Sequence, residues 1–226
     1  MRLAGVSGAR ATREGPLRLA LPRGALWTPT LDLLDAIGIP TAEPRSDSRA
    51  LVFEADGVVL VTMRPSDVPT YVEAGAADLG ITGKDVLLEQ QDRAVYELVD
   101  LRYGTCRMVV AGREGDESLG ESERRLGAMR IATKYPRIAE RYFQDKGRRA
   151  EVIEVKGSVE LAPLVGLADG IVDLVDTGRT LADNGLEVRE EIAHCTARLV
   201  ANRVAHKLRA TEVDAFAERL REATRT

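Results

Sequence analysis

The chain has 226 residues, of which 44% are hydrophobic and 30% are charged, so it can bury one sizeable core or two smaller ones. Its 32 basic and 36 acidic residues give a net charge of −4 without a large basic block, which argues against nucleic-acid binding as the main role. Two cysteines and two histidines are too few for a disulfide framework or a histidine-rich metal centre, and no apolar run approaches the length of a membrane span.

The first sixteen residues carry three arginines among small residues but lack the apolar core of a secretory signal. We interpret residues 1–16 as a disordered leader. The cysteines, Cys106 and Cys195, lie too far apart in sequence for a CxxC metal site, and their scarcity suits a reducing compartment. We therefore expect a cytoplasmic protein.

The folded chain is expected to begin with a strand over residues 17–21, followed at once by a basic glycine turn and a helix over 26–37. A glycine turn between a strand and a helix N-terminus suits an anion, which makes Arg23 and Gly24 candidate binding residues. Arg49 ends a polar loop just before a second strand. The ordinary alternative for Arg49 is a solvated loop arginine.

Strands and helices then alternate, which predicts a largely parallel sheet. The expected strands and helices of this first part lie at 51–53, 58–63, 65–74, 78–82, 83–88, 96–100 and 106–111. Residues 112–127 break the pattern with Gly, Ser, Asp and Glu. We interpret them as an exposed connection, either at a domain boundary or on the surface of one domain.

A second alternating unit follows, with expected strands and helices at 129–132, 136–146, 152–155, 158–167 and 171–175, and extended segments at 186–192 and 197–204. Lys134 and Glu160 lie in turns at strand carboxyl ends, where ligands collect in open α/β sheets. Glu160 is alternatively a capping-box partner in the turn at Ser158. Thr211 is expected to cap a last amphipathic helix, whose apolar face carries Val213, Phe216, Ala217 and Leu220.

The most informative stretch is the strand at 171–175 and the turn after it, Asp176-Thr-Gly-Arg-Thr180. A glycine lets backbone N–H groups approach an anion, and two hydroxyls and a guanidinium add donors, so the turn resembles a phosphate-binding site. Asp173 and Asp176 suit sugar hydroxyls, directly or through a hard cation such as Mg²⁺. The alternative is an ordinary strand-to-helix turn with an N-cap Asp or Thr.

Taken together, these motifs strongly resemble ATP phosphoribosyltransferase, the first enzyme of histidine biosynthesis. The strings that carry the resemblance, in the family's order, are 21–24, 64–89, 130–136, 157–163 and 173–181. The resemblance covers roughly residues 17–203, and the length is that of the short form, which lacks a C-terminal histidine-binding domain. It implies an α/β fold of two domains of the periplasmic-binding-protein (type II) kind, with the active site in the cleft between them. We expect the first domain at 17–108 plus 190–226 and the second at 109–189.

The resemblance also implies the reaction, in which N1 of the ATP adenine displaces pyrophosphate from C1 of phosphoribosyl pyrophosphate. Mg²⁺ is required, and we expect the substrate phosphates to carry most of its coordination. Because adenine nitrogen is a weak nucleophile, an oxocarbenium-like transition state is expected. Positioning of the two substrates and electrostatic stabilisation of the transition state would then account for the rate acceleration.

Residue roles follow from the same resemblance. The expected phosphoribosyl pyrophosphate residues are Glu160, Asp173, Asp176, Thr177, Gly178, Arg179, Thr180 and Leu181. The expected ATP residues are Arg23, Gly24, Arg49 and Arg64, and the expected catalytic cations are Arg23, Arg49 and Lys134. Many members of the family carry arginine where this chain has Ala25, which places more weight on Arg23 and Arg49.

The expected partners are ATP and phosphoribosyl pyrophosphate, a second copy in a catalytic homodimer, and a regulatory subunit similar to histidyl-tRNA synthetase, with no nucleic acid and no membrane. Two alternatives stay open. One is a type I phosphoribosyltransferase acting on a free base, although that family has adjacent acidic residues, whereas Leu174 and Val175 separate Asp173 from Asp176. The other is a non-enzymatic solute-binding protein of the same fold, which usually has a signal peptide.

Overall fold

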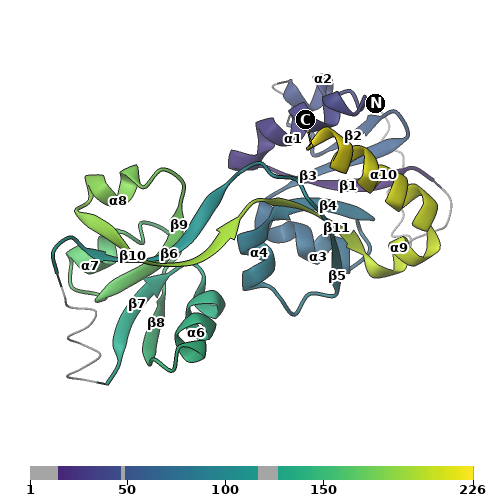
Figure 1. Ribbon diagram of the computed structural model, residues 1–226. Coiled ribbons are helices and arrows are strands. Elements are labelled where there is room, and N and C mark those ends of the chain that lie inside the picture. The colour runs from purple at the N-terminus through teal and green to yellow at the C-terminus, as the bar shows by residue number, and fades with distance from the viewer. Residues whose placement is uncertain (1–14, 47–48, 117–126, 226) are drawn as a thin grey trace. The chain divides into compact units, whose positions relative to one another are not determined.

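The computed structural model describes residues 15–46, 49–116 and 127–225 (Figure 1). It divides into two compact units, one formed by the chain up to Gly104 and from Thr196 onward, the other by Thr105–Cys195. The expected leader and the centre of the expected connection at 112–127 lie largely outside the described residues. None of the helices in the described parts is both long and apolar enough to cross a membrane.

The first unit contains a six-stranded sheet in the order β2-β3-β1-β4-β11-β5. Its strands are β1 (Leu17–Pro22), β2 (Val52–Ala55), β3 (Val58–Met63), β4 (Leu79–Gly83), β5 (Val95–Asp100) and β11 (Ala197–Asn202). Only the pairs β3–β1 and β1–β4 are parallel, while the pairs β2–β3, β4–β11 and β11–β5 are antiparallel. The expectation of a largely parallel sheet is therefore wrong. Asp56 and Gly57 both have positive φ and form a two-residue hairpin turn between β2 and β3, and β11 enters from the second unit.

Helices cover both faces of this sheet. They are α1 (Trp27–Ala36), α2 (Ala42–Arg45), α3 (Val68–Glu73), α4 (Lys84–Glu89), α9 (Arg203–Leu208) and α10 (Ala210–Ala223), with 3-10 turns η1 (Gly24–Leu26) and η2 (Pro65–Asp67). Leu31 of α1 and Phe216 of α10 pack in one core with alternate strand residues, whereas Val68 and Val72 of α3 pack on the opposite face. The alternation of strand side chains between two helical layers confirms the α/β interpretation of this part.

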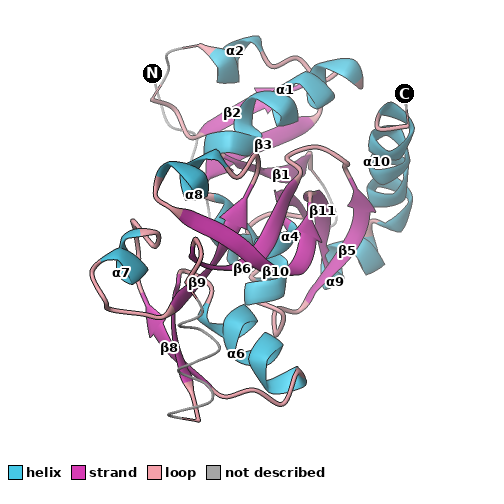
Figure 2. Cartoon of the chain, turned by 60° about the vertical axis from the view of Figure 1, so that its left-hand side comes forward, coloured by secondary structure: helices cyan, strands magenta, loops and turns pink. Residues whose placement is uncertain are grey.

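The second unit contains a five-stranded mixed sheet in the order β10-β6-β9-β7-β8 (Figure 1). Figure 2 shows its strands in magenta and its helices in cyan. The strands are β6 (Cys106–Arg113), β7 (Met129–Thr133), β8 (Ala150–Glu154), β9 (Gly170–Val175) and β10 (Leu186–Cys195), and the helices are α6 (Pro136–Asp145), α7 (Leu161–Leu164) and α8 (Arg179–Asp183). β7 runs parallel to β8 and β9. β6 and β10 are antiparallel neighbours, and Cys106 lies directly opposite Cys195, although no disulfide joins them.

Several expected elements differ from the structure. The helix expected at 158–167 is only the single turn α7, in a segment that contains Pro163 and then Gly166 at φ 74°. The polar loop expected before Arg49 contains the short helix α2. Val204, expected to be extended, lies in α9, because the Asn202 side chain accepts hydrogen bonds from the first-turn N–H groups. Thr211 lies within α10 and does not cap it.

Candidate functional site

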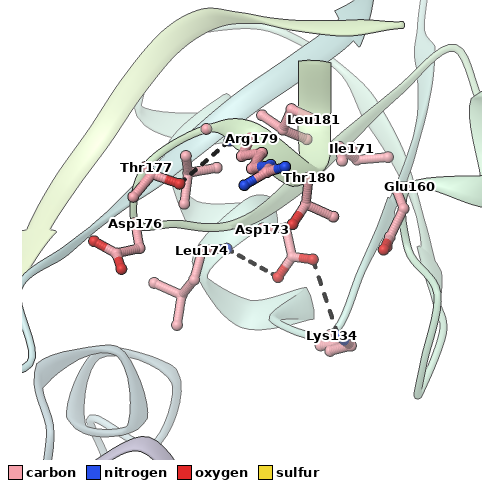
Figure 3. A pocket seen from close by; sticks show the side chains of 12 residues that line it. Lys134, Glu160, Ile171, Asp173, Leu174, Asp176, Thr177, Arg179, Thr180 and Leu181 are labelled. Carbon is pink, nitrogen blue, oxygen red and sulfur yellow. Dashed lines mark hydrogen bonds and ion pairs between the residues drawn. The ribbon is translucent and has the colours of Figure 1, made fainter. Parts of the chain in front are cut away.

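A pocket in the second unit lies at the carboxyl end of β9 (Figure 3). Its lining residues come from β9, from the turn into α8, and from the turns after β7 and before α7, and they are Lys134, Glu160, Ile171, Asp173, Leu174, Val175, Asp176, Thr177, Gly178, Arg179, Thr180 and Leu181. All eight residues expected to hold phosphoribosyl pyrophosphate are among them. Ile171, Leu174 and Val175 were not predicted, although they lie on the same strand as Asp173.

The turn from β9 into α8 is held by its glycine. Gly178 adopts the left-handed conformation at φ 80°, which a glycine reaches without strain, and it serves as the N-cap of α8. No side chain caps this helix, so the alternative of an ordinary turn with an N-cap Asp or Thr does not describe it. The Thr177 hydroxyl accepts a long contact of 3.4 Å from the Arg179 N–H. The first turn of α8 therefore presents backbone donors with little competition from side chains.

The Asp173 carboxyl group is largely enclosed by the pocket, with a side chain that is 17% exposed. Burial raises the pKa of Asp173, and the charge of Glu160 adds to the rise. The Leu174 N–H, which donates to Asp173 Oδ1 at 2.9 Å, and the Lys134 ammonium, 3.9 Å from Oδ2, act in the opposite direction without reversing it (Figure 3). The Asp173 carboxylate is thus held in place by its own strand, with a cation nearby.

The other polar groups of the turn face solvent. Asp176, Thr177, Arg179 and Thr180 are exposed. The Arg179 side chain is 86% exposed and pairs with Asp183 at 3.6 Å, an interaction between exposed groups that is worth little. Arg179 can therefore turn toward an anion at small cost.

Glu160 is half-buried at the N-cap of α7, and no side-chain hydrogen bond caps that helix. The capping-box alternative for Glu160 is therefore wrong. Leu181 is buried, and its side chain contributes to the apolar core under the turn.

The residues expected to hold ATP lie in the first unit, and none of them lines this pocket. Arg23 and Arg64 follow the parallel strands β1 and β3, and the Arg23 N–H donates to the Met63 carbonyl at 2.8 Å, so the two turns share one sheet edge. The Arg23 guanidinium lies over Trp27 at 4.4 Å and donates to the Thr62 hydroxyl at 3.2 Å. It is thus already oriented by neighbouring side chains.

The remaining two residues of this set are open to solvent. Gly24 has φ 85°, and an added Cβ would meet no atom within 4 Å. Conformation, and not crowding, therefore favours glycine at this position. Arg49 is exposed and lies between α2 and β2, just before the strand, as the sequence predicted.

No group of three or more His, Cys, Asp or Glu side chains in the described parts of the chain is arranged to hold a metal ion. Asp173 and Asp176 both line the pocket, but they follow one another on a strand and its turn and do not form a metal cage. The donor set fits an ion that brings most of its ligands with it, as magnesium does when it binds through substrate phosphates.

Comparison with known proteins decides the family. The family model described as HisG: ATP phosphoribosyltransferase matches residues 64–222. The chain belongs to the ATP phosphoribosyltransferase family. An ATP phosphoribosyltransferase from Rubrobacter xylanophilus is 52% identical over 198 residues, covering 87% of this chain and 91% of the relative. One from Moorella thermoacetica is 48% identical over 212 residues, with 92% of each chain covered.

Solved structures agree with this assignment. A chain from the ATP phosphoribosyl transferase (HisG:HisZ) complex of Thermotoga maritima has a TM-score of 0.77 and 37% identity, covering 92% of this chain and 98% of that one. The periplasmic aliphatic sulphonate binding protein SsuA of Escherichia coli has a TM-score of 0.59 at 15% identity, a likeness of fold alone. The expected fold of the periplasmic-binding-protein type is confirmed.

The family's reaction is the transfer of a phosphoribosyl group from phosphoribosyl pyrophosphate to ATP, the first step of histidine biosynthesis, and this is the activity of the chain. The two alternatives, a type I phosphoribosyltransferase and a non-enzymatic solute-binding protein, are therefore wrong. Members of the family use a metal ion.

Proposed function

We propose that the pocket at the carboxyl end of β9 binds phosphoribosyl pyrophosphate, with the 5-phosphate on the turn Asp176–Thr180 and the ribose beside Asp173 and Glu160. The observation that carries the proposal is that all eight residues expected for this substrate line one pocket. The left-handed Gly178 and the start of α8 support the phosphate position, because Gly178 brings no capping side chain and the long 3.4 Å contact from the Arg179 N–H to the Thr177 hydroxyl is easily displaced.

Each side chain then has a distinct role. The Thr177 and Thr180 hydroxyls and the Arg179 guanidinium donate to phosphate oxygens. Asp173 and Glu160 accept hydrogen bonds from ribose hydroxyls, and Asp173 offers a fixed acceptor because its own backbone neighbour holds it.

We place ATP against the first unit, on Arg23, Gly24, Arg49 and Arg64. Support comes from the shared edge of β1 and β3, where two of these arginines follow parallel strands. Arg23 is held by Trp27 and Thr62, which leaves its other N–H groups for a phosphate. Ala25 adds no charge on this side, so the three arginines carry the electrostatic attraction.

Catalysis by these residues is electrostatic. When the bond from C1 to pyrophosphate breaks, positive charge develops on the ribose ring and negative charge on the leaving group. Arg23, Arg49 and Lys134 stabilise the leaving pyrophosphate, and the pocket holds C1 still while adenine N1 attacks. The chain has no covalent role in this scheme.

The metal ion is proposed to be Mg²⁺, which supplies charge neutralisation on the pyrophosphate. Pocket carboxylates would contribute one ligand at most, since substrate oxygens and water complete the octahedral shell that Mg²⁺ prefers.

We further propose that the chain acts in the cytoplasm as a homodimer, joined to a regulatory subunit similar to histidyl-tRNA synthetase. The solved HisG:HisZ complex supports the second subunit, because nearly the whole of its matching chain is covered by this one.

A spectrophotometric assay for phosphoribosyl-ATP tests the proposal. Purified protein with Mg²⁺ should consume phosphoribosyl pyrophosphate with ATP and not with free purines, and chelation of Mg²⁺ should abolish turnover. Turnover with a free purine instead of ATP would contradict the assignment of substrates.

A further inference from the structure

Thr133 is a fully buried residue at the edge of the pocket. It is the last residue of β7, its side chain has no exposed surface, and Lys134 follows it directly. Its hydroxyl donates to the Val172 carbonyl at 2.6 Å and accepts from the Tyr135 N–H at 2.8 Å. One hydroxyl thus binds the residue after Lys134 and the residue before Asp173.

These two bonds fix the backbone on both sides of the pocket's ion pair. The Tyr135 N–H donates back to the Thr133 hydroxyl, so the backbone turns at Lys134, as it does in other turns that a threonine hydroxyl stabilises. The bond to Val172 joins that turn to β9 at the register where Thr133 and Val172 are already paired. The turn carrying Lys134 therefore cannot shift along β9 without breaking a buried hydrogen bond.

The ion pair itself does not provide this precision. Lys134 Nζ lies 3.9 Å from Asp173 Oδ2, and the Lys134 side chain is 40% exposed. A pair with this separation and exposure is weak and leaves the ammonium several orientations. The position of Lys134 must come from its backbone.

We propose that Thr133 is a positioning residue, which places the Lys134 ammonium beside Asp173 and never touches substrate. The proposal rests on the catalytic role proposed above for Lys134. Thr133 has no surface with which to meet a ligand, so any effect on turnover passes through the turn that it holds.

Steady-state kinetics on four variants and one control test this. Thr133→Val keeps the branched shape without the hydroxyl, and Thr133→Ser keeps the hydroxyl. We expect Thr133→Val to lower kcat roughly ten- to hundredfold, because small misplacements of a catalytic group are costly, with KM for ATP changed by less than about twofold. Thr133→Ser should restore most of the lost kcat.

The double variant Thr133→Val, Lys134→Ala supplies the decisive comparison. Its kcat should equal that of Lys134→Ala alone within about twofold, because the hydroxyl has nothing left to position. The control is Thr41→Val, which removes another buried hydroxyl, one that bonds Asp35 in the first unit. Both Thr133→Val and Thr41→Val should lower the melting temperature, because each removes a buried hydrogen bond. Thr41→Val should do so without loss of kcat.

The outcomes separate the two proposals. If Lys134→Ala has wild-type kcat, the role of Lys134 fails and this inference falls with it. If Lys134→Ala is impaired while Thr133→Val is not, or if the two losses multiply in the double variant, only the inference is overturned. A kcat loss in Thr41→Val equal to that in Thr133→Val would also overturn it. Should the valine variant not fold, Thr133→Ala replaces it in every comparison.

Discussion

Asp173 and Lys134 lie at the carboxyl ends of adjacent parallel strands, β9 and β7. They place one carboxylate and one ammonium group side by side in the pocket. The sequence predicted Lys134 from the turn that follows a buried strand, and Asp173 from its place near the carboxyl end of the strand at 171–175. It could not predict their separation of 3.9 Å, which depends on the strand order. Thr133 was missed because a threonine at a strand end has many ordinary uses. The only signal was its place directly before a turn residue already singled out.

Arg49 gives a sharp prediction at the scale of one residue. It is exposed, so truncation leaves no buried group unpaired. If its guanidinium stabilises charge that develops on the leaving pyrophosphate, Arg49→Ala should lower kcat by on the order of 10²-fold and change KM little. Initial-rate kinetics at saturating substrates measure this. Arg45→Ala is the control, since Arg45 pairs with Asp32 and Asp35, and its kcat should match wild type.

Among the elements, β10 is joined to α6 and the turn after it by one half-buried acidic group, Glu190. Glu190 accepts hydrogen bonds from Tyr142 at 2.8 Å, from Lys146 at 2.7 Å and from Arg148. Burial alone would raise the pKa of Glu190, but the bonds from Lys146, Tyr142 and Arg148 outweigh it and lower the pKa to about 2. The charged form is therefore the one that stabilises the second unit.

The pH dependence of stability follows from that shift. A carboxyl group with a depressed folded pKa stabilises the fold above its unfolded pKa, and the contribution disappears as the pH falls toward 2. Glu190→Gln should lower the free energy of unfolding at pH 7 by at most about 3 kcal/mol, and the difference from wild type should shrink below pH 4.5.

Urea unfolding between pH 7 and pH 3 measures this difference. Glu191→Gln is the matched control on the same strand, because Glu191 is exposed and its pairs, with Arg107 at 3.3 Å and with His194 at 2.6 Å, lie on the surface. It should change stability by less than about 0.5 kcal/mol. A difference for Glu190→Gln that persists undiminished to pH 3 would contradict the assigned cause.

Element prediction was most reliable where one face is apolar. The apolar face of α10 predicted four core residues, Val213, Phe216, Ala217 and Leu220, and all four are buried. It failed where tertiary contacts decide. The antiparallel pairing of β4 and β5 with β11 arises because β11 returns from the second unit and inserts between them, and local periodicity does not predict that insertion. The Asp56-Gly57 hairpin carried a readable signal that was not used.

At the scale of the whole molecule, the chain passes twice between its units, near Gly104 and near Cys195. The sequence-based boundaries at 108/109 and 189/190 fall inside β6 and β10. Those two strands are paired along their length, so a cut within them separates hydrogen-bonded partners. A boundary drawn from composition alone does not register such pairing, since it depends on residues far apart in sequence.

Control by histidine is a property of the assembly in our account. A ligand changes activity only through different affinities for two states, so inhibition requires a histidine site whose occupancy favours one of them. We propose that this site lies on the regulatory subunit. The isolated chain should be at most weakly sensitive to histidine, and addition of the subunit should confer strong inhibition. Rate measurements with and without the subunit test this, and strong non-competitive inhibition of the isolated chain would contradict it.

We propose that the turn Asp176–Thr180 grips the 5-phosphate of phosphoribosyl pyrophosphate and takes no part in holding ATP. Calorimetric titration of both substrates into the double variant Thr177→Val, Thr180→Val tests it most directly, since valine keeps the branched shape and removes only the hydroxyls. Loss of a hydroxyl bonded to a charged group costs about 1.5–3 kcal/mol, so binding of phosphoribosyl pyrophosphate should weaken at least tenfold while ATP binding stays within about twofold of wild type. Equal losses for the two ligands, or unchanged binding of phosphoribosyl pyrophosphate, would contradict the account.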